Sequence, residues 1–204
     1  MYLQQGLATA SLDVPSDHPD EITQQFRGSG AHVEDAAAAI AQITARWPDA
    51  PLFIAGGSNG TISATNLGLN LNEPRVRALI LTSTVGLMGS TTFFTVANLP
   101  VEQVRLPVLM VHHRNDGCGL SRYDAAQWVR ARLTSSPKVD FVSVSGGTPL
   151  SGDPCNAPGP HGLYGREREV VAAIVDYVAG RPVPEQIGST DRLLAGAWSA
   201  GEQG

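Results

Sequence analysis

The apolar positions of this chain fall into two periodic patterns that alternate along its length. Two nearly continuous apolar runs of strand length, 76–82 and 106–112, are typical of strands buried on both faces of a parallel sheet. A third apolar run, 52–55, ends in glycines, and residues 139–144 alternate as a strand does. Residues 7–13 are predicted to form another short strand, which the prolines that follow would end.

Helical periodicity fills the intervals between these strands. Helices are predicted at 31–47, 62–71, 121–133 and 167–178. We expect Ser121 to be the N-cap of the third helix and Trp128 to lie on its apolar side. Strands that alternate with helices in this way predict an α/β fold with a doubly wound, mostly parallel sheet.

One domain is the expected organisation, because no repeat or shift of composition divides the chain. We place this domain at residues 1–180 and predict a poorly anchored C-terminal extension over 181–204. Residues 85–101 have no clear period, and we interpret them as a loop that lines a pocket, with packing against the core as the alternative.

The glycine-flanked Ser58 is the first candidate for chemistry. Residues 56–60 fit G-x-S-x-G between a predicted strand and a predicted helix, the context of a nucleophile elbow. A serine at so tight a turn takes a strained backbone, and we expect Gly56 and Gly60 to be glycines because side chains there would collide. The alternative is a chance match, since the chain has 22 glycines.

Two later loops supply residues that could activate this serine. A serine hydroxyl needs an imidazole to take its proton, and the imidazole needs a carboxylate to hold its tautomer. Asp116 follows the strand 106–112, and His161 lies in the loop after the last predicted strand, so the order is Ser, Asp, His. As alternatives, Asp116 could be only a turn residue, His161 an ordinary loop histidine, and Asp153 a rival acid.

A metal site is the weaker interpretation of the histidines. His112 and His113 are adjacent and close to Asp116, but no HExxH or paired Cys-x-x-Cys pattern accompanies them. We therefore expect no metal and no cofactor.

Charge and hydropathy exclude other classes of partner. The formal net charge is −5 and the basic residues are not clustered, which argues against a nucleic-acid or anionic-membrane surface. No apolar run reaches the roughly 18 to 20 residues of a membrane span, and the first ten residues do not resemble a secretory signal.

The chain has two cysteines, and each lies close to a candidate site residue. Cys118 is two positions after Asp116, and Cys155 is six positions before His161. We predict a disulfide that ties the two loops together and stabilises the fold by about 3 to 4 kcal/mol, with two free thiols as the alternative. Such a bond indicates an oxidising compartment, the periplasm or the exterior.

These motifs together resemble the α/β-hydrolase superfamily, in particular bacterial, typically exported members. The resemblance is carried by the DxPSD-like segment 13–17, the GxSxGTxSA elbow and the D-x-C…C-x5-H arrangement, and it covers residues 7 to about 178. The family pattern implies three strands and a helix before residue 7, one of them inside the sheet beside the elbow strand, and residues 1–5 resemble the end of that helix.

We therefore expect this chain to lack the amino-terminal part of the family pattern, and this truncation would affect activity, location and assembly. The missing part would carry the loop that donates one of the two backbone N–H groups to the oxyanion. The remaining expected donor is the backbone N–H of Asn59. An export signal lost with that part would make the protein periplasmic or secreted, whereas the chain as given would be cytoplasmic. The incomplete sheet is also expected to invite self-association.

The leading functional hypothesis is a serine hydrolase that cleaves an ester or similar acyl bond of a small molecule. Ser58 would attack, His161 would shuttle the proton and Asp116 would orient His161. Candidate residues for the acyl pocket are Met88, Phe93, Phe94 and Tyr164. The alternatives are an inactive hydrolase-fold remnant that serves as a binding module, and a metal-dependent hydrolase.

Overall fold

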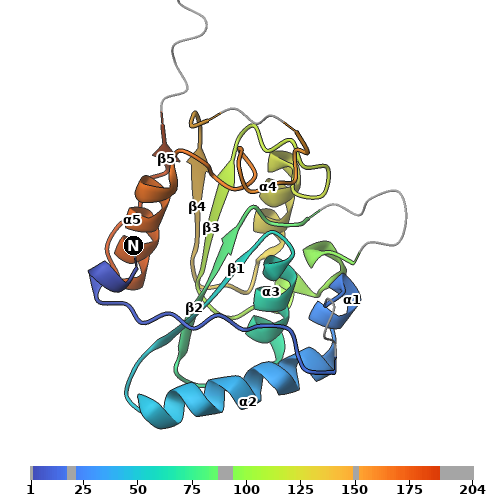
Figure 1. Cartoon of the computed structure of the whole chain (residues 1–204), viewed down its shortest axis with the longest axis vertical. Coiled ribbons are helices and arrows are strands. Elements are labelled where there is room, and N and C mark those ends of the chain that lie inside the picture. The colour runs from blue at the N-terminus through green and yellow to red at the C-terminus, as the bar shows by residue number, and fades with distance from the viewer. Residues whose placement is uncertain (1, 18–21, 87–93, 149–151, 189–204) are drawn as a thin grey trace, which may run out of the picture.

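Five parallel strands form one sheet in the order β1-β2-β3-β4-β5, shown in the computed structural model of Figure 1. The structure describes residues 2–17, 22–86, 94–148 and 152–188. The strands are β1 (Leu52–Gly57), β2 (Val76–Thr82), β3 (Val108–His113), β4 (Val139–Val144) and β5 (Gln186–Ile187). Strand order follows chain order, so the carboxyl ends of all five strands lie at the same edge of the sheet.

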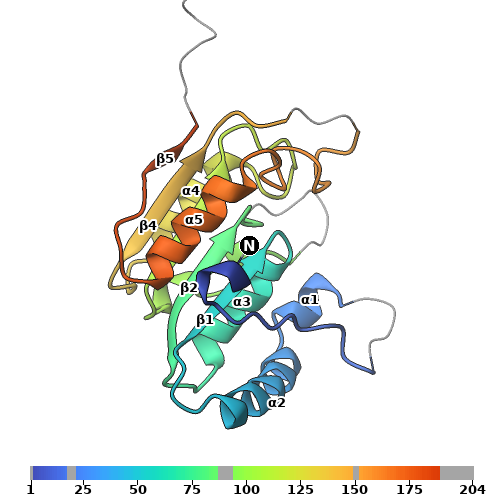
Figure 2. The same cartoon turned by 60° about the vertical axis from the view of Figure 1, so that its left-hand side comes forward.

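Helices cover both faces of this sheet, as the sequence predicts. Helices α3 (Gly60–Asn70) and α4 (Tyr123–Arg132) lie on one face, and α5 (Glu167–Val178) lies on the other (Figure 1). Two further helices, α1 (Gln24–Arg27) and α2 (Gly30–Arg46), pack beside α3, and three short 3-10 helices span Leu3–Gln5, Val96–Asn98 and Val101–Gln103. Figure 2 shows α5 in front of the sheet, running in roughly the same direction as the strands. The fold is therefore a doubly wound α/β sheet.

The two faces of β2 and β3 fill two separate hydrophobic cores, which confirms that these strands are buried on both sides. Leu79, Leu81 and Met110 pack towards α3 and α4, whereas Ile80 and Leu109 pack towards α5. Successive side chains of a strand point to opposite faces, so a continuous apolar run is needed to satisfy both cores.

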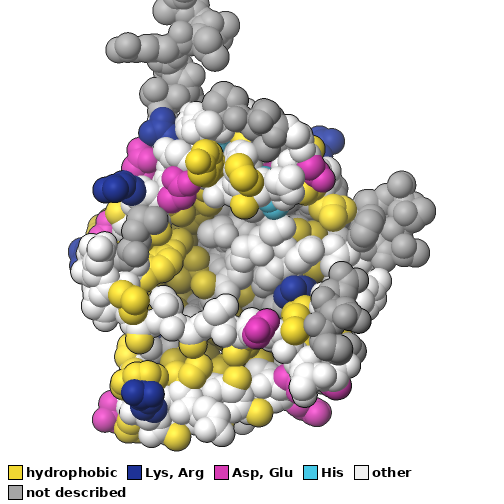
Figure 3. All heavy atoms as spheres, viewed as in Figure 1, with side chains coloured by type: hydrophobic (Ala, Val, Ile, Leu, Met, Phe, Trp, Pro, Cys, Tyr) yellow, Lys and Arg dark blue, Asp and Glu magenta, His cyan; other side chains and the backbone are white. Residues whose placement is uncertain are grey.

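The edge strand β1 has β2 as its neighbour, and no other described strand pairs with it. The strand predicted at 7–13 is wrong: those residues form no hydrogen-bonded ladder and are largely exposed. An isolated segment cannot form a strand without a partner for its backbone groups. Figure 3 shows that apolar side chains gather in a hollow beside α5 on this side of the molecule.

The prediction of a loose extension from residue 181 is also wrong for the part that the structure describes. Gln186 and Ile187 pair with Ser143 and Val144 of β4, and Ile187 is 5% exposed within the α5-side core. Two residues are too short to show a strand pattern in the sequence, and the neighbouring strand provides the hydrogen bonds that make them one.

Residues 85–101 pack against the core instead of lining a pocket, as far as they are described. Val85, Val96, Leu99 and Val101 are buried in the cluster under α3 and α4. Leu87, Met88 and Phe93 lie outside the described residues. Over the described part of the chain, no helix combines the length and apolar character that crossing a membrane requires.

The start of α4 differs from the prediction. The N-cap is Arg122, without a side-chain capping bond, and the hydroxyl of Ser121 donates to Asp116 Oδ2 instead of capping the helix. Trp128 is 49% exposed, with the guanidinium of Arg132 stacked over its ring, so it does not belong to the apolar side of the helix.

Candidate active site

Ser58 lies at the sharp turn between β1 and α3. Its φ angle is +50°, in the left-handed region that non-glycine residues rarely adopt. Two contacts hold the turn: the Ser58 N–H donates to the Thr82 carbonyl at 3.0 Å, and the Thr61 hydroxyl donates to the Ser58 carbonyl at 2.6 Å. The segment therefore has the strained strand–turn–helix geometry that the motif predicts.

The two glycines of the motif are not equivalent. A Cβ atom on Gly56 would lie 2.2 Å from the carbonyl oxygen of Gly60, whereas a Cβ on Gly60 would meet nothing within 4 Å. The expectation that both positions exclude a side chain is thus wrong for Gly60. The turn brings the backbone of residue 60 against the Cα of residue 56. A side chain is therefore sterically excluded at Gly56 but not at Gly60.

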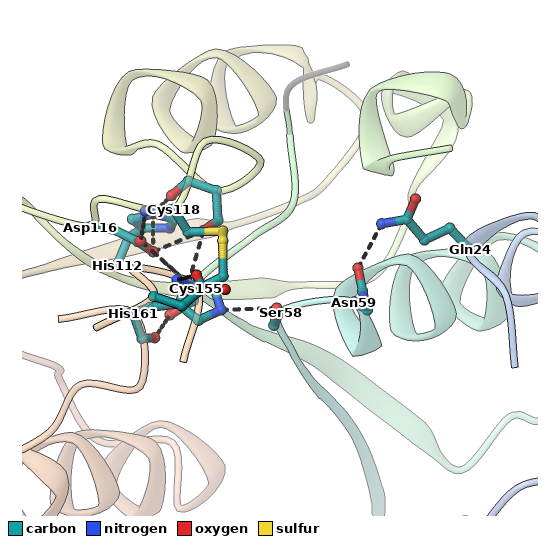
Figure 4. Close-up of a disulfide and its surroundings, with 11 residues drawn as sticks. Gln24, Ser58, Asn59, His112, Asp116, Cys118, Cys155 and His161 are labelled. Carbon is teal, nitrogen blue, oxygen red and sulfur yellow. Dashed lines mark hydrogen bonds and ion pairs between the residues drawn. A yellow bond between two sulfur atoms is a disulfide. The ribbon is translucent and has the colours of Figure 1, made fainter. Parts of the chain in front are cut away.

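Two loops at the carboxyl edge of the sheet bring Asp116 and His161 to this serine (Figure 4). His161 Nε2 lies 2.9 Å from Ser58 Oγ, and its Nδ1 lies 3.0 Å from Asp116 Oδ2 and 3.3 Å from Oδ1. Asp116 follows β3 and His161 lies in the loop that leads from β4 to α5. The structure thus brings the three predicted residues together in one hydrogen-bonded chain.

Burial decides how the protons are arranged in this chain. The side chain of Asp116 is 0% exposed and that of His161 is 5% exposed, so little water competes for their hydrogen bonds. Because Nδ1 faces a carboxylate, it carries the imidazole proton, and Nε2 is free to accept the hydroxyl proton of Ser58. This is the tautomer that a general base for Ser58 requires.

The rival acid Asp153 does not reach His161. It is exposed, and its Oδ1 accepts the Cys155 N–H at 2.8 Å. Asp153 therefore stabilises a turn of the loop, and the carboxylate beside the imidazole is that of Asp116.

Two further buried residues, Ser121 and His112, support this site through hydrogen bonds. The fully buried Ser121 hydroxyl donates to Asp116 Oδ2 at 3.0 Å and lies 2.9 Å from His161 Nδ1. His112 Nδ1 accepts the Thr84 N–H at 3.2 Å, so its Nε2–H donates to the Ser121 carbonyl at 2.6 Å. Burial lowers the pKa of His112 below its ordinary value, which keeps the ring neutral.

The histidine loop is anchored at three points. Cys155 forms a disulfide with Cys118, with a Cα–Cα distance of 4.6 Å, so the predicted pairing is present in the structure. The hydroxyl of Ser83 donates to the carbonyl of His161. A Cβ on Gly162 would lie 1.9 Å from the Ala157 carbonyl oxygen, so the loop closes tightly behind the imidazole.

A cavity of about 270 Å³ opens beside Ser58. Its walls come from the elbow, the end of β2 and the histidine loop: Gly57, Ser58, Thr82, Ser83, Cys155, Ala157, His161, Gly162 and Leu163. Thr82 and Ser83 stand at the carboxyl end of β2, where parallel sheets place their sites, and that rule could have found them.

The residues expected in an acyl pocket lie elsewhere. Phe94 packs against the core and its ring touches Gly28, while Tyr164 is 47% exposed, and neither lines this cavity. Met88 and Phe93 lie outside the described residues.

The N–H of Asn59 stands at the start of α3, next to Ser58. It donates no hydrogen bond to another residue in the described part of the chain. The Asn59 side chain is held by Gln24 of α1, whose Nε2 donates to Asn59 Oδ1 at 2.8 Å. The backbone N–H is thus available to an anion beside Ser58, with the positive end of the helix dipole behind it.

Both nitrogens of His112 and of His113 are hydrogen-bonded inside the protein. His113 Nδ1 accepts the Asn115 N–H at 3.0 Å, and its Nε2–H donates to the Gly146 carbonyl at 2.9 Å. Among the described residues, no group of three or more potential ligands is placed to hold a metal ion. The structure therefore does not assemble the ligand set considered for these histidines.

The doubly wound parallel sheet and the strained serine turn between a strand and a helix place the protein in the α/β-hydrolase class. A sequence model of the family described as serine aminopeptidase, S33, matches residues 22–141, more than half of the 204 residues, and the chain belongs to this hydrolase family. The matched part contains Ser58 and Asp116 and ends before His161. Among curated proteins, none matches the chain at a significant level.

Proposed function

We propose that the protein is a serine hydrolase that cleaves an ester or similar acyl bond of a small molecule. The observation that carries the proposal is the chain of short contacts from Ser58 Oγ through His161 to the buried carboxylate of Asp116. Family membership supports hydrolase activity in general, and the chain of contacts supports the serine mechanism.

In the proposed mechanism each residue of the site has its own chemical role. His161 Nε2 takes the hydroxyl proton while Ser58 Oγ forms a bond to the acyl carbon, and Asp116 stabilises the resulting imidazolium through Nδ1–H. The Asn59 N–H donates to the carbonyl oxygen as it becomes an oxyanion. His161 then gives its proton to the leaving alcohol as the bond to that group breaks. A water molecule then gives a proton to His161 Nε2 as its oxygen bonds to the acyl carbon, and His161 returns that proton to Ser58 Oγ as the bond between Oγ and the acyl carbon breaks, which releases the acid.

The cavity favours an ester over the free N-terminus of a peptide. Among the described residues, its walls contain Thr82, Ser83 and the apolar Ala157 and Leu163, and no Asp or Glu lines it. An aminopeptidase needs an acceptor for the α-ammonium group of its substrate, and a carboxylate is the usual one. We therefore propose a neutral acyl group of modest size as the part that enters this cavity.

A fluorophosphonate probe tests the proposal directly. The purified protein should be labelled covalently, and Ser58→Ala should remove the label together with hydrolysis of p-nitrophenyl acetate or butyrate. Ser63→Ala is the matched control, because Ser63 lies in α3, the helix that follows the turn of Ser58, and its hydroxyl accepts from Arg27 and does not contact the imidazole. An aminoacyl p-nitroanilide, tested in parallel, should be the poorer substrate.

A folded wild-type protein that the probe does not label would contradict the enzyme and support the binding-module alternative. Loss of activity by a chelator with labelling intact would support the metal-dependent alternative. The protein must be shown to be folded in each case by its circular dichroism spectrum.

We also propose that the protein works in an oxidising compartment. The Cys118–Cys155 disulfide supports this, because such bonds persist mainly outside the cytosol. Mass mapping of alkylated, non-reduced protein from its own cells should find both cysteines bridged. Two alkylated cysteines would contradict the proposed location.

A further inference from the structure

We propose that Ser121 is a positioning residue of the active site, which shares the Nδ1 proton of His161 with Asp116 and is itself held in place by His112. This inference rests on the proposed serine-hydrolase function for its kinetic consequence, although the contact itself is testable without activity. The sequence predicts Ser121 as a helix cap and offers a metal ligand only as the weaker interpretation of His112, whereas in the structure the N-cap is Arg122 and both nitrogens of His112 are hydrogen-bonded.

The proton inventory fixes what the Ser121 hydroxyl can do. It has one proton, which points to the charged acceptor Asp116 Oδ2 at 3.0 Å. Its oxygen, 2.9 Å from His161 Nδ1, is then left to accept, so the Nδ1–H is shared between this oxygen and the carboxylate. If the Ser121 hydroxyl donated to Nδ1 instead, lone pairs of the Ser121 oxygen and of Nδ1 would both face the carboxylate. The imidazole proton would then lie on Nε2, which could not accept the hydroxyl proton of Ser58.

The position of Ser121 is set by its own backbone. Its N–H donates to the Cys118 carbonyl at 3.1 Å, and its carbonyl accepts the Nε2–H of His112 at 2.6 Å. His112 is fully buried, bonded on its other nitrogen to Thr84 after β2, and its Nε2 lies 3.5 Å from Asp116 Oδ2. A neutral ring that links the ends of β2 and β3 thus fixes the hydroxyl against both Asp116 and His161.

The hydroxyl also completes the donors around the buried carboxylate. Asp116 Oδ1 accepts the Cys118 N–H at 2.9 Å, and Oδ2 accepts Ser121 and His161. Without Ser121, Oδ2 would lose its only hydroxyl donor among the described residues, and a buried carboxylate that lacks a donor is costly. The carboxylate would then be held only by the Cys118 N–H and by His161 among the described donors, so the imidazole would be oriented less firmly.

Ser121→Ala tests the inference, with proton NMR as the direct measurement. The Nδ1–H resonance of His161, assigned by its loss in His161→Gln, should shift because one of its acceptors is removed. In kinetic assays, kcat should fall about tenfold or more while KM changes little, since the hydroxyl touches no substrate. Ser136→Ala is the matched control: its hydroxyl donates to the Leu106 and Lys138 carbonyls, at the opposite end of the sheet, and neither readout should change.

An unchanged Nδ1–H resonance in folded Ser121→Ala would overturn the inference, as would unchanged kcat in an active wild type. A fall in KM and kcat that Ser136→Ala reproduces would mean a general loss of stability and would also overturn it. If the wild type proves inactive, the proposed function fails, and the NMR shift alone still decides whether Ser121 shares the proton.

Discussion

The Nε2 atom of His161 lies 2.9 Å from the Oγ atom of Ser58, although 103 positions separate the two residues in the chain. This contact depends on two loops that meet at the carboxyl edge of the sheet, and on a third that supplies Asp116. The disulfide, the Ser83 hydroxyl and the closed turn at Gly162 hold the imidazole there.

The identity of the acid can be tested with two matched carboxylates. Asp116→Asn should lower kcat by about 10³- to 10⁴-fold, because an amide would favour the wrong tautomer of His161. Asp153→Asn should leave kcat unchanged, since its carboxylate accepts the Cys155 N–H and has no bond to His161 among the described residues. Steady-state hydrolysis of a p-nitrophenyl ester measures both. Equal losses in the two variants would refute the assignment of Asp116.

The disulfide should contribute to stability and to the placement of His161. It closes a loop with a sequence separation of 37 residues, and its removal in Cys118→Ala/Cys155→Ala should lower the free energy of unfolding by about 4 kcal/mol. Activity should fall but persist, because Ser83 still holds the His161 carbonyl. Urea unfolding and ester hydrolysis give the two measurements. A double variant as stable and as active as the wild type would show that the tether is dispensable.

The two glycines of the elbow should respond differently to alanine. Gly56→Ala places a Cβ 2.2 Å from a backbone carbonyl that cannot move without opening the turn, and should cost about 3 kcal/mol or more. Gly60→Ala meets open space at the first residue of α3, so stability should change by less than about 1 kcal/mol, towards the more stable side. Thermal unfolding measures both. A Gly60→Ala variant damaged as severely as Gly56→Ala would contradict the geometry of this turn.

Stability should fall as the pH falls below about 6.5, the ordinary pKa of histidine. Burial lowers the pKa of His112 and of His32, so the unfolded chain takes up protons that the folded protein does not. Each histidine then lowers the free energy of unfolding by at most about 1.4 kcal/mol per pH unit. This loss extends from the pKa of the histidine in the unfolded chain down to its lowered pKa in the folded protein, and above pH 7 it ends.

His32 allows this pH effect to be tested outside the site. His32 is 6% exposed and its ring packs against Phe26, and within the described part of the chain neither of its ring nitrogens has a hydrogen-bond partner. His32→Leu should raise the free energy of unfolding, more at pH 5.5 than at pH 7.5, because a buried polar ring without partners is costly. Urea unfolding at the two pH values measures the difference. A variant with the pH dependence of the wild type would contradict the prediction.

Much of the fold follows from local pattern. The apolar run 76–82 and the alternation of 139–144 have the bounds of β2 and β4, and the helical period of 167–178 has the bounds of α5. These elements are recognisable because each must bury a particular face, and burial imposes a period on the sequence. Residues 7–13 have a similar composition and form no strand, because pairing depends on a neighbour that the local sequence does not show.

The elements of the site were recognisable only in part. Ser58, Asp116 and His161 could be proposed from their order and from the rule that sites lie beyond the carboxyl ends of parallel strands. Ser121 could not be, since nothing in the sequence shows that its hydroxyl faces both Asp116 of its own loop and His161 of another loop. Thr82 and Ser83 of the cavity, and the different needs of Gly56 and Gly60, likewise became visible only in three dimensions.

The sequence by itself determined the class of fold, the strained turn at Ser58 and the candidate residues of the site, because these depend on burial periods and on short motifs. Only the tertiary structure decided which carboxylate faces His161, which polar groups surround that carboxylate, and which side chains line the cavity. Those are distances between loops far apart in the chain, and they are fixed by the packing of the sheet that carries them.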